Sequence, residues 1–198
     1  MAMRLFACTL LDSADRAAYD AMIGRLADTY GRLLRPIPAE SAHVTYAFIA
    51  HLDDARVPVA IDALEAAVGR LEPVPVTIGA PHVLFGGREA RLIHAPVVSD
   101  GAALTQVANQ VATALEVALP EAPINRSRSL HVTLARFRRG TPRGAAQVVV
   151  EALARSDEAP ALTHTRFTHV QLVSSELTTA GPIYAVLASV ALGPGLKA

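Results

Sequence analysis

The sequence contains the same three residues, His-Val-Thr, twice, each time inside a segment that has the apolar pattern of a β-strand. The first copy, His43 to Thr45, lies in SAHVTYAFIAHL, and the second, His131 to Thr133, lies in SLHVTLARFRRG, 88 residues further along. Because successive side chains of a strand point to opposite faces, the histidine and threonine of each copy share one face and the valine takes the other. The repeat therefore predicts two strands that each present an imidazole and a hydroxyl to a common surface.

The pattern around the two copies alternates strands with amphipathic helices. It predicts one α+β domain over residues 1–198 with internal pseudo-symmetry: two similar halves, two antiparallel sheets facing each other across a central cleft, and helices on the outside. We expect Ser13 to cap the first helix and Thr141-Pro142 to open the fourth. We also expect Gly86-Gly87 to turn a hairpin. The expected strands cover 3–11, 43–49, 72–81, two segments within 83–97, 130–137, 162–167, 170–174 and 183–192, and the expected helices follow 13, 53–71, 100–119 and 142.

Composition limits the functions that the chain can have. It has 18 basic and 18 acidic residues, so no global charge favours tight, unspecific binding to nucleic acid. Apolar residues make up 52% of the chain, enough for a core, but no apolar run is long enough to span a bilayer. The single cysteine, Cys8, excludes an internal disulfide and lies in a strand, where we expect it to be a core residue. We expect a monomeric cytoplasmic protein that does not bind membranes.

Two imidazoles and two hydroxyls in one cleft would suit a small anion such as a phosphate. A histidine has a reference pKa of about 6.5, so at neutral pH one ring can accept a proton while the other donates one. Water could then attack phosphorus without a nucleophilic serine or a metal. A single His-x-Thr in a strand is common by chance, and the spacing alone leaves open whether the two copies form a site or serve only as strand residues.

The sequence resembles the two-histidine phosphoesterase superfamily, and within it the bacterial and archaeal RNA 2′,3′-cyclic phosphodiesterases, also called 2′-5′ RNA ligases. The similarity extends over nearly the whole chain. MRLFACTLLD is similar to the first strand of that family, LLRPIPAESAHVTYAFIAHLDD to its first motif region and HVTLAR to its second motif. The ending, VQLVSSELTTAGPIYAVLASVAL, resembles the family's ending, in which Gly-Pro-x-Tyr follows a serine-leucine segment.

The resemblance implies a bilobal fold and hydrolysis of a terminal RNA 2′,3′-cyclic phosphate to a 2′-phosphate, without a metal or other cofactor. His43 would protonate the departing 3′ oxygen and His131 would activate the attacking water, although pseudo-symmetry makes these two roles hard to distinguish. Thr45 and Thr133 would hold phosphate oxygens. Arg136 is a further phosphate-binding candidate on the resemblance alone, because on an ideal strand it faces away from Thr133 and needs a twist, a bulge or its own length to reach the cleft.

The first motif departs from the family pattern, which is often HLTLRFLG, because Tyr46 and Ala47 replace a leucine and an arginine. This change leaves the preferred substrate open. The partners expected are RNA ends or small cyclic nucleotides. The alternatives are a related enzyme acting on another small nucleotide or on a 2′-5′-linked oligonucleotide, and a module that binds RNA ends without catalysis.

Several further residues have two interpretations. Six arginines near the second motif form either a solvated charged loop or a track for the RNA backbone. Phe48 and Tyr184 are candidates for stacking on a base, but on strand parity Phe48 opposes His43, and both have equally good core interpretations. The remaining histidines show no spacing typical of metal ligands, and we interpret His51 as an exposed loop residue. The six arginines are Arg126, Arg128, Arg136, Arg138, Arg139 and Arg143, and the other histidines are His82, His94, His164 and His169.

Overall fold

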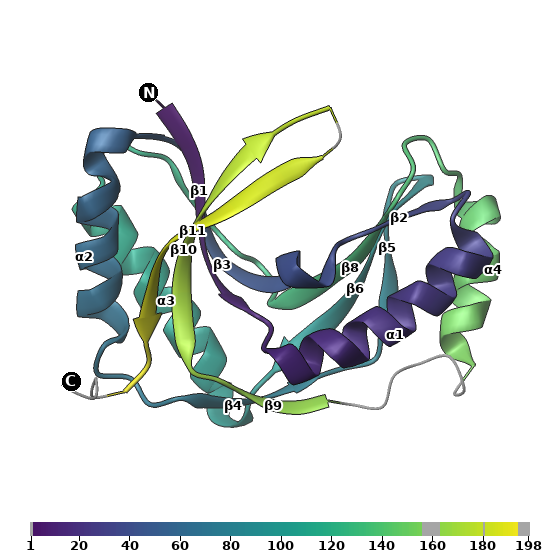
Figure 1. The fold of residues 1–198 in the computed structure, drawn as a ribbon, viewed down its shortest axis with the longest axis horizontal. Coiled ribbons are helices and arrows are strands. Elements are labelled where there is room, and N and C mark those ends of the chain that lie inside the picture. The colour runs from purple at the N-terminus through teal and green to yellow at the C-terminus, as the bar shows by residue number, and fades with distance from the viewer. Residues whose placement is uncertain (1, 156–162, 180, 194–198) are drawn as a thin grey trace.

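The computed structural model describes residues 2–155, 163–179 and 181–193 (Figure 1). The helices are α1 (Ser13–Tyr30), α2 (Val57–Val68), α3 (Ala103–Ala118) and α4 (Arg143–Ala154). The strands are β1 (Ala2–Leu10), β2 (Leu34–Pro36), β3 (His43–Asp53), β4 (Val74–Ile78), β5 (His82–Gly86), β6 (Glu89–Val98), β7 (Ile124–Arg126), β8 (His131–Phe137), β9 (Thr163–Phe167), β10 (His169–Leu177) and β11 (Pro182–Ala191). None of the described helices is both long and apolar enough to cross a membrane.

The strands form a curled antiparallel sheet that divides into two lobes, as the sequence predicts (Figure 1). In one lobe β11, β10, β1 and β3 lie side by side, with α2 and α3 packed against each other on the outside. In the other lobe β8 and β6 pair with each other and with the shorter β2 and β5, while α1 and α4 cover this lobe. The lobes are not consecutive halves of the chain, because β1 pairs with β10, near the C-terminal end.

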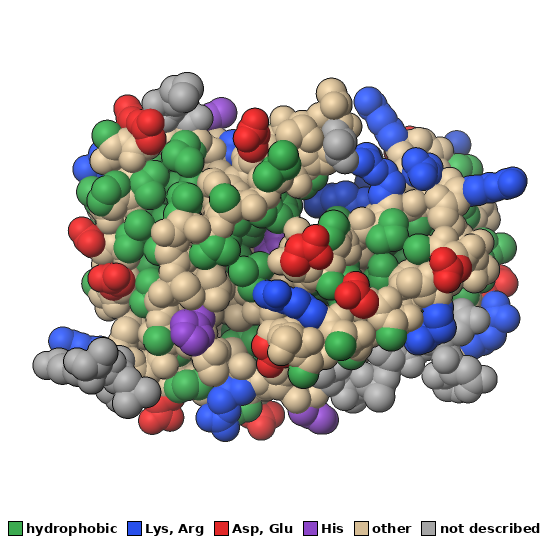
Figure 2. All heavy atoms as spheres, viewed as in Figure 1, with side chains coloured by type: hydrophobic (Ala, Val, Ile, Leu, Met, Phe, Trp, Pro, Cys, Tyr) green, Lys and Arg blue, Asp and Glu red, His purple; other side chains and the backbone are tan. Residues whose placement is uncertain are grey.

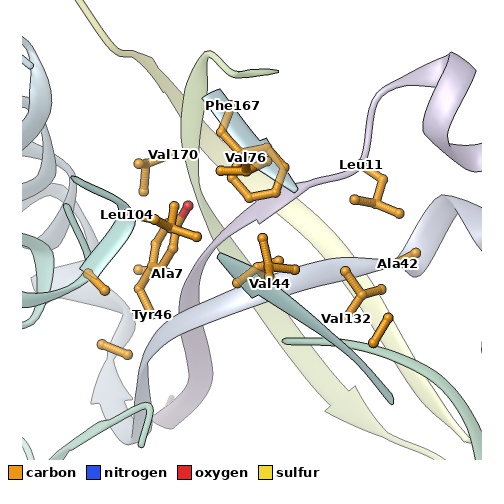
Figure 3. Packing of buried hydrophobic residues seen from close by; sticks show 14 of the residues in the cluster. Ala7, Leu11, Ala42, Val44, Tyr46, Val76, Leu104, Val132, Phe167 and Val170 are labelled. Carbon is orange, nitrogen blue, oxygen red and sulfur yellow. The ribbon is translucent and has the colours of Figure 1, made fainter. Parts of the chain in front are cut away.

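The two lobes meet where β3 crosses β8. The pairing between these strands is limited to Val44 and Val132, and both side chains are fully buried. Figure 3 shows both valines within the cluster of buried hydrophobic residues, together with Leu11 and Tyr46. The valines therefore anchor the crossing point in the core. The histidine and threonine on either side of each valine face the other side of the sheet.

A β-bulge follows each His-Val-Thr segment. In β3, Cys8 pairs with Thr45 and Ala7 with Ala47, so Tyr46 is an extra residue. In β8, Thr133 pairs with His94 of β6 and Ala135 pairs with Ile93, so Leu134 is an extra residue. A bulge reverses the alternation of faces beyond it. Each strand accordingly has two buried residues in succession at this point.

The bulges correct the prediction made from strand parity. Phe48 lies on the same face as His43, and Arg136 lies on the same face as His131. The two residues occupy equivalent positions in the two strands. Ala47 is fully buried on the core side, so the arginine that the family often has here would enter a core that offers it no water.

Three local predictions need correction. Asp12, not Ser13, caps α1, because its carboxylate accepts a hydrogen bond from the amide of Asp15. Pro142, not Thr141, is the N-cap of α4, and the Thr141 hydroxyl donates instead to the Arg138 carbonyl. The third correction extends the first motif strand to residue 53, so the exposed His51 is in a strand and not in a loop.

Other predictions were confirmed or incomplete. The helix expected within 53–71 forms as α2, and Pro58 lies at its start, where its missing amide costs no hydrogen bond. Cys8 is fully buried, as expected of a core residue, and burial raises the pKa of its thiol. The short strands β2 and β7 were not predicted, because three residues are too few to show a periodic pattern. Leu162, at the start of an expected strand, lies outside the described residues.

Candidate active site

The crossing of β3 and β8 brings the two His-Val-Thr segments together. The strands are antiparallel with Val44 opposite Val132, so His43 lies beside Thr133 and Thr45 beside His131 on the other face. The crossing therefore gathers two imidazoles and two hydroxyls around one point, with each histidine next to the threonine of the other segment.

Backbone carbonyls orient both imidazoles in the same way. The Nδ1 atom of His43 lies 2.6 Å from the Ser41 carbonyl oxygen, and that of His131 lies 3.0 Å from the Ser129 carbonyl oxygen. A carbonyl can only accept, so each Nδ1 carries the proton and donates it. In both rings Nε2 is left as the nitrogen that can exchange a proton with a ligand. The signal in the sequence was a serine two residues before each histidine; both serines contribute the carbonyl, and the Ser129 hydroxyl also lies 3.3 Å from Nδ1 of His131.

The hydroxyls of the two motif threonines are unpaired in the part of the chain that the structure describes. Both Thr45 and Thr133 are half-buried. A half-buried hydroxyl without a protein partner is available to a ligand oxygen. The two threonines predicted to hold phosphate oxygens therefore have free donors at the crossing point.

Two aromatic rings surround His43. Phe6 stacks on it, with 4.7 Å between ring centroids and 28° between ring planes, and Tyr184 meets it edge-on at 5.6 Å. Burial lowers the pKa of His43, and the nearby charges of His131 and Arg136 lower it further. The Ser41 carbonyl, which holds the ring proton, opposes this shift. In the free protein His43 is therefore held toward its neutral form.

His131 has a different neighbour, which the sequence did not reveal. His94 of β6 meets the His131 ring edge-on, with 5.0 Å between centroids, and His82 of β5 lies 6.4 Å beyond His94. Burial lowers the pKa of His94, and the charges of His131 and His82 add to this. The predicted hairpin could have paired His82 with His94, but the contact with His131 depends on the nonlocal pairing of β6 with β8.

A cavity of about 490 Å³ opens next to Ser41 and Tyr184, two residues that contact the His43 ring. Ser41, Arg136 and Tyr184 contribute to its lining. Figure 2 shows a hollow between the lobes with arginine or lysine side chains gathered at its rim, below the β10–β11 hairpin on the right. Three more arginines line the cavity, namely Arg35, Arg91 and Arg139.

Of the six arginines near the second motif, only Arg136 and Arg139 line this cavity. The others lie elsewhere, so the six do not form one continuous track. Arg126 pairs with Glu116, Arg138 donates to the Gly31 carbonyl, Arg143 stacks over Phe85 at 3.9 Å and Arg128 lines a separate hollow near the start of α3. Sequence proximity failed here because Arg35 and Arg91 reach the cavity from other strands.

Phe48 of β3 and Tyr184 of β11 both belong to the lobe formed by β11, β10, β1 and β3. They are partly buried and pack against a small cluster of Phe6, Cys8 and Val173 that is separate from the main core. The guanidinium of Arg4 lies over the Phe48 ring at 5.1 Å. Within the described residues no group of three or more His, Cys, Asp or Glu side chains could hold a metal ion.

Comparisons with known proteins agree with this fold. The family model of the 2′-5′ RNA ligase superfamily matches residues 15–179. The crystal structure of TT0787 of Thermus thermophilus is similar, with a TM-score of 0.75, 23% identity and coverage of 98% of this chain and 100% of that one. E. coli LigT complexed with NADP+ has a TM-score of 0.70 at 18% identity, covering 98% and 99% of the two chains. The MHV ns2 PDE domain has a TM-score of 0.59 at 13% identity, covering 86% and 99%. No curated protein matches the sequence.

Proposed function

Because the chain belongs to the 2′-5′ RNA ligase superfamily, we propose that it is an RNA 2′,3′-cyclic phosphodiesterase, which opens a terminal cyclic phosphate to leave a 2′-phosphate. The observation that carries the proposal is the crossing of β3 and β8, where both histidines donate Nδ1–H to a carbonyl and keep Nε2 for a ligand. This is the arrangement that a reaction needs when one proton must be removed and another delivered around one phosphorus atom.

In the proposed reaction, Nε2 of one imidazole takes a proton from water, and the water oxygen forms a bond to phosphorus. The bond from phosphorus to the ribose 3′ oxygen breaks, and Nε2 of the other imidazole gives that oxygen its proton. Thr45, Thr133 and Arg136 donate to the phosphate oxygens, on which charge develops. Acid–base catalysis of this kind contributes about 10²–10⁴-fold, and each well-placed donor about 10²–10³-fold.

On the resemblance, His43 is the acid and His131 the base. Burial lowers the pKa of His43, which opposes this role in the free protein. A bound phosphate anion favours the charged imidazole and so raises the pKa again. The proposal therefore requires that His43 gains its proton when the substrate binds.

The first test replaces each histidine with alanine. We expect His43→Ala and His131→Ala each to lower kcat by at least about 10²-fold on a cyclic mononucleotide, because each removes a proton-transfer group. His51→Ala is the matched control, since His51 is an exposed histidine of the same strand as His43. Circular dichroism and thermal unfolding would show that the variants fold. We also expect full activity in a chelator, because the two imidazoles supply the proton transfers.

The outcomes of this test separate the functions considered. Activity that survives either substitution contradicts the proposal. Binding of RNA ends with no turnover in the wild type would indicate a binding module. Turnover confined to 2′-5′-linked oligonucleotides would indicate that the same site cleaves the 2′-5′ linkage and not a cyclic phosphate.

The second test assigns the roles of the two histidines. In a 2′-O,3′-S-cyclic phosphorothiolate the leaving atom is sulfur, which departs without being protonated. We expect this substrate to restore most of the activity of His43→Ala and little of that of His131→Ala, because only the acid becomes unnecessary. The reverse pattern would exchange the two roles and would leave the proposed reaction intact.

A further inference from the structure

The cavity next to Ser41 and Tyr184 carries more positive charge than one cyclic phosphate requires. Among the described residues, four arginines line it, Arg35, Arg91, Arg136 and Arg139, against a single carboxylate, that of Glu89. The Glu89 carboxylate lies 3.9 Å from Arg91, and both side chains are largely exposed, so this ion pair contributes little. A concave wall with several like charges attracts an anion from solution.

The cavity lies next to the crossing point: none of the four motif residues lines it, but Ser41, Arg136 and Tyr184 do. Arg136 is on the face of β8 that carries His131, and its charge acts on both His43 and Tyr184. Tyr184 lines the cavity and also meets the His43 ring. The other arginines reach the cavity from β2, from β6 and from the segment after β8. Arg136 and Tyr184 thus connect the cavity to the histidines, so one ligand that reaches both places would carry two anionic groups.

We propose that this cavity binds the phosphodiester on the 5′ side of the terminal nucleotide, so that the protein prefers a cyclic phosphate at the end of an RNA chain to a cyclic mononucleotide. The inference rests on the proposed function. An RNA chain that ends in a 2′,3′-cyclic phosphate can continue only from the 5′ oxygen of its last ribose, so its next phosphate is the diester at that position. The cavity volume of about 490 Å³ lies within the range of about 300–1,000 Å³ typical of ligand pockets.

The experiment compares three substrates that differ only at the 5′ position. They are adenosine 2′,3′-cyclic phosphate with a free 5′ hydroxyl, the same nucleotide with a 5′-phosphate, and a dinucleotide that ends in the same cyclic nucleotide. We expect kcat/KM to be at least about tenfold higher for the dinucleotide than for the 5′-hydroxyl compound, because hydrogen bonds from charged groups are worth about this much.

The variant Arg91→Met/Arg139→Met tests the residues. It should reduce the preference for the dinucleotide by about tenfold. The matched control is Arg25→Met/Arg138→Met, which removes the same charge from exposed arginines of the same lobe outside the cavity and should keep the preference. With a longer oligonucleotide, the slope of log kcat/KM against log salt should become shallower by about 0.7 when the contact with this one phosphate is lost.

Each outcome decides the inference. A preference that is absent, or that survives Arg91→Met/Arg139→Met, overturns it. A preference for the 5′-phosphorylated mononucleotide but not for the dinucleotide would make the occupant a small nucleotide and would overturn the assignment to an RNA chain. If no cyclic phosphate is hydrolysed, the proposed function fails, and a binding measurement then tests the role of the cavity separately. Adenosine 2′,5′-bisphosphate should bind the wild type at least about tenfold more tightly than adenosine 2′-phosphate. Equal binding of the two compounds refutes the inference.

Discussion

Replacing Arg136 tests the link between the bulge in β8 and the chemistry at the crossing point. Without the bulge, Arg136 would face the core side of the sheet, where Val132 and Leu134 are buried. With it, the guanidinium lies on the face of His131 and lines the cavity. An arginine in that position can donate two parallel hydrogen bonds to a phosphate.

We expect Arg136→Met to lower kcat/KM for a cyclic mononucleotide by about 10²–10³-fold. The magnitude is that of one oriented donor to a developing oxyanion, about 2.7–4 kcal/mol. The same change should raise the pKa of His43, because the Arg136 charge is one of the causes that lower it. The limb of the pH–rate profile that follows His43 should therefore move to higher pH, and an NMR titration of the ring should show the same direction.

Arg136→Lys separates charge from geometry. Lysine keeps the positive charge but loses the planar fork, so the pKa of His43 should stay near its wild-type value while much of the rate is lost. Arg138→Met is the matched control: Arg138 lies two residues further along, outside the cavity, and donates to the Gly31 carbonyl. A wild-type rate in Arg136→Met, or an Arg138→Met defect of equal size, would refute the role given to the bulge.

Two further predictions concern stability. The Thr9 hydroxyl donates to the His169 carbonyl, so the Tyr46 hydroxyl, 2.7 Å away, is the donor to the buried Thr9 oxygen. Tyr46→Phe removes this donor and should lower the free energy of unfolding by about 1–3 kcal/mol in chemical denaturation; an equal loss in Tyr30→Phe would contradict this. The pKa of His94 is lowered in the folded state. As pH falls below about 6.5, His94 therefore binds a proton more readily in the unfolded chain than in the folded one. The contribution of His94 to the free energy of unfolding is full above that pH and is lost below it. His94→Leu should make this loss between pH 7 and 5 less steep, and an unchanged slope would show that His94 does not contribute.

The sequence predicted the two motif strands and the residues that meet, because local alternation and the repeated tripeptide are both visible in a single chain. It did not predict which face Phe48 and Arg136 take, since that depends on bulges set by pairing with β1 and β6. His94 was missed for the same reason. Pairing between distant strands is decided by how the whole sheet packs, and no short window of sequence contains it.

The arginines show a second limit of sequence reasoning. Six lie close together in the sequence around the second motif, yet they point to different partners, and the charged cavity draws on Arg35 and Arg91 from other strands. The lobes likewise combine early and late segments, because β1 needs β10 as well as β3 to complete its sheet. The order of elements along the chain indicated the two-lobed fold, but it could not indicate which elements share a lobe.

The departures from symmetry have a chemical consequence. A cyclic phosphate has two ring oxygens that can leave, at the 2′ and 3′ positions, and a site with perfect two-fold symmetry could not distinguish them. The backbone around the two histidines is nearly equivalent, with the same carbonyl contact and the same bulge. The equivalent positions beyond the bulges differ, however, since one strand carries Phe48 and the other Arg136. This difference between the two strands, and not the nearly equivalent backbone at the histidines, is the asymmetry on which the proposed formation of the 2′-phosphate alone must depend.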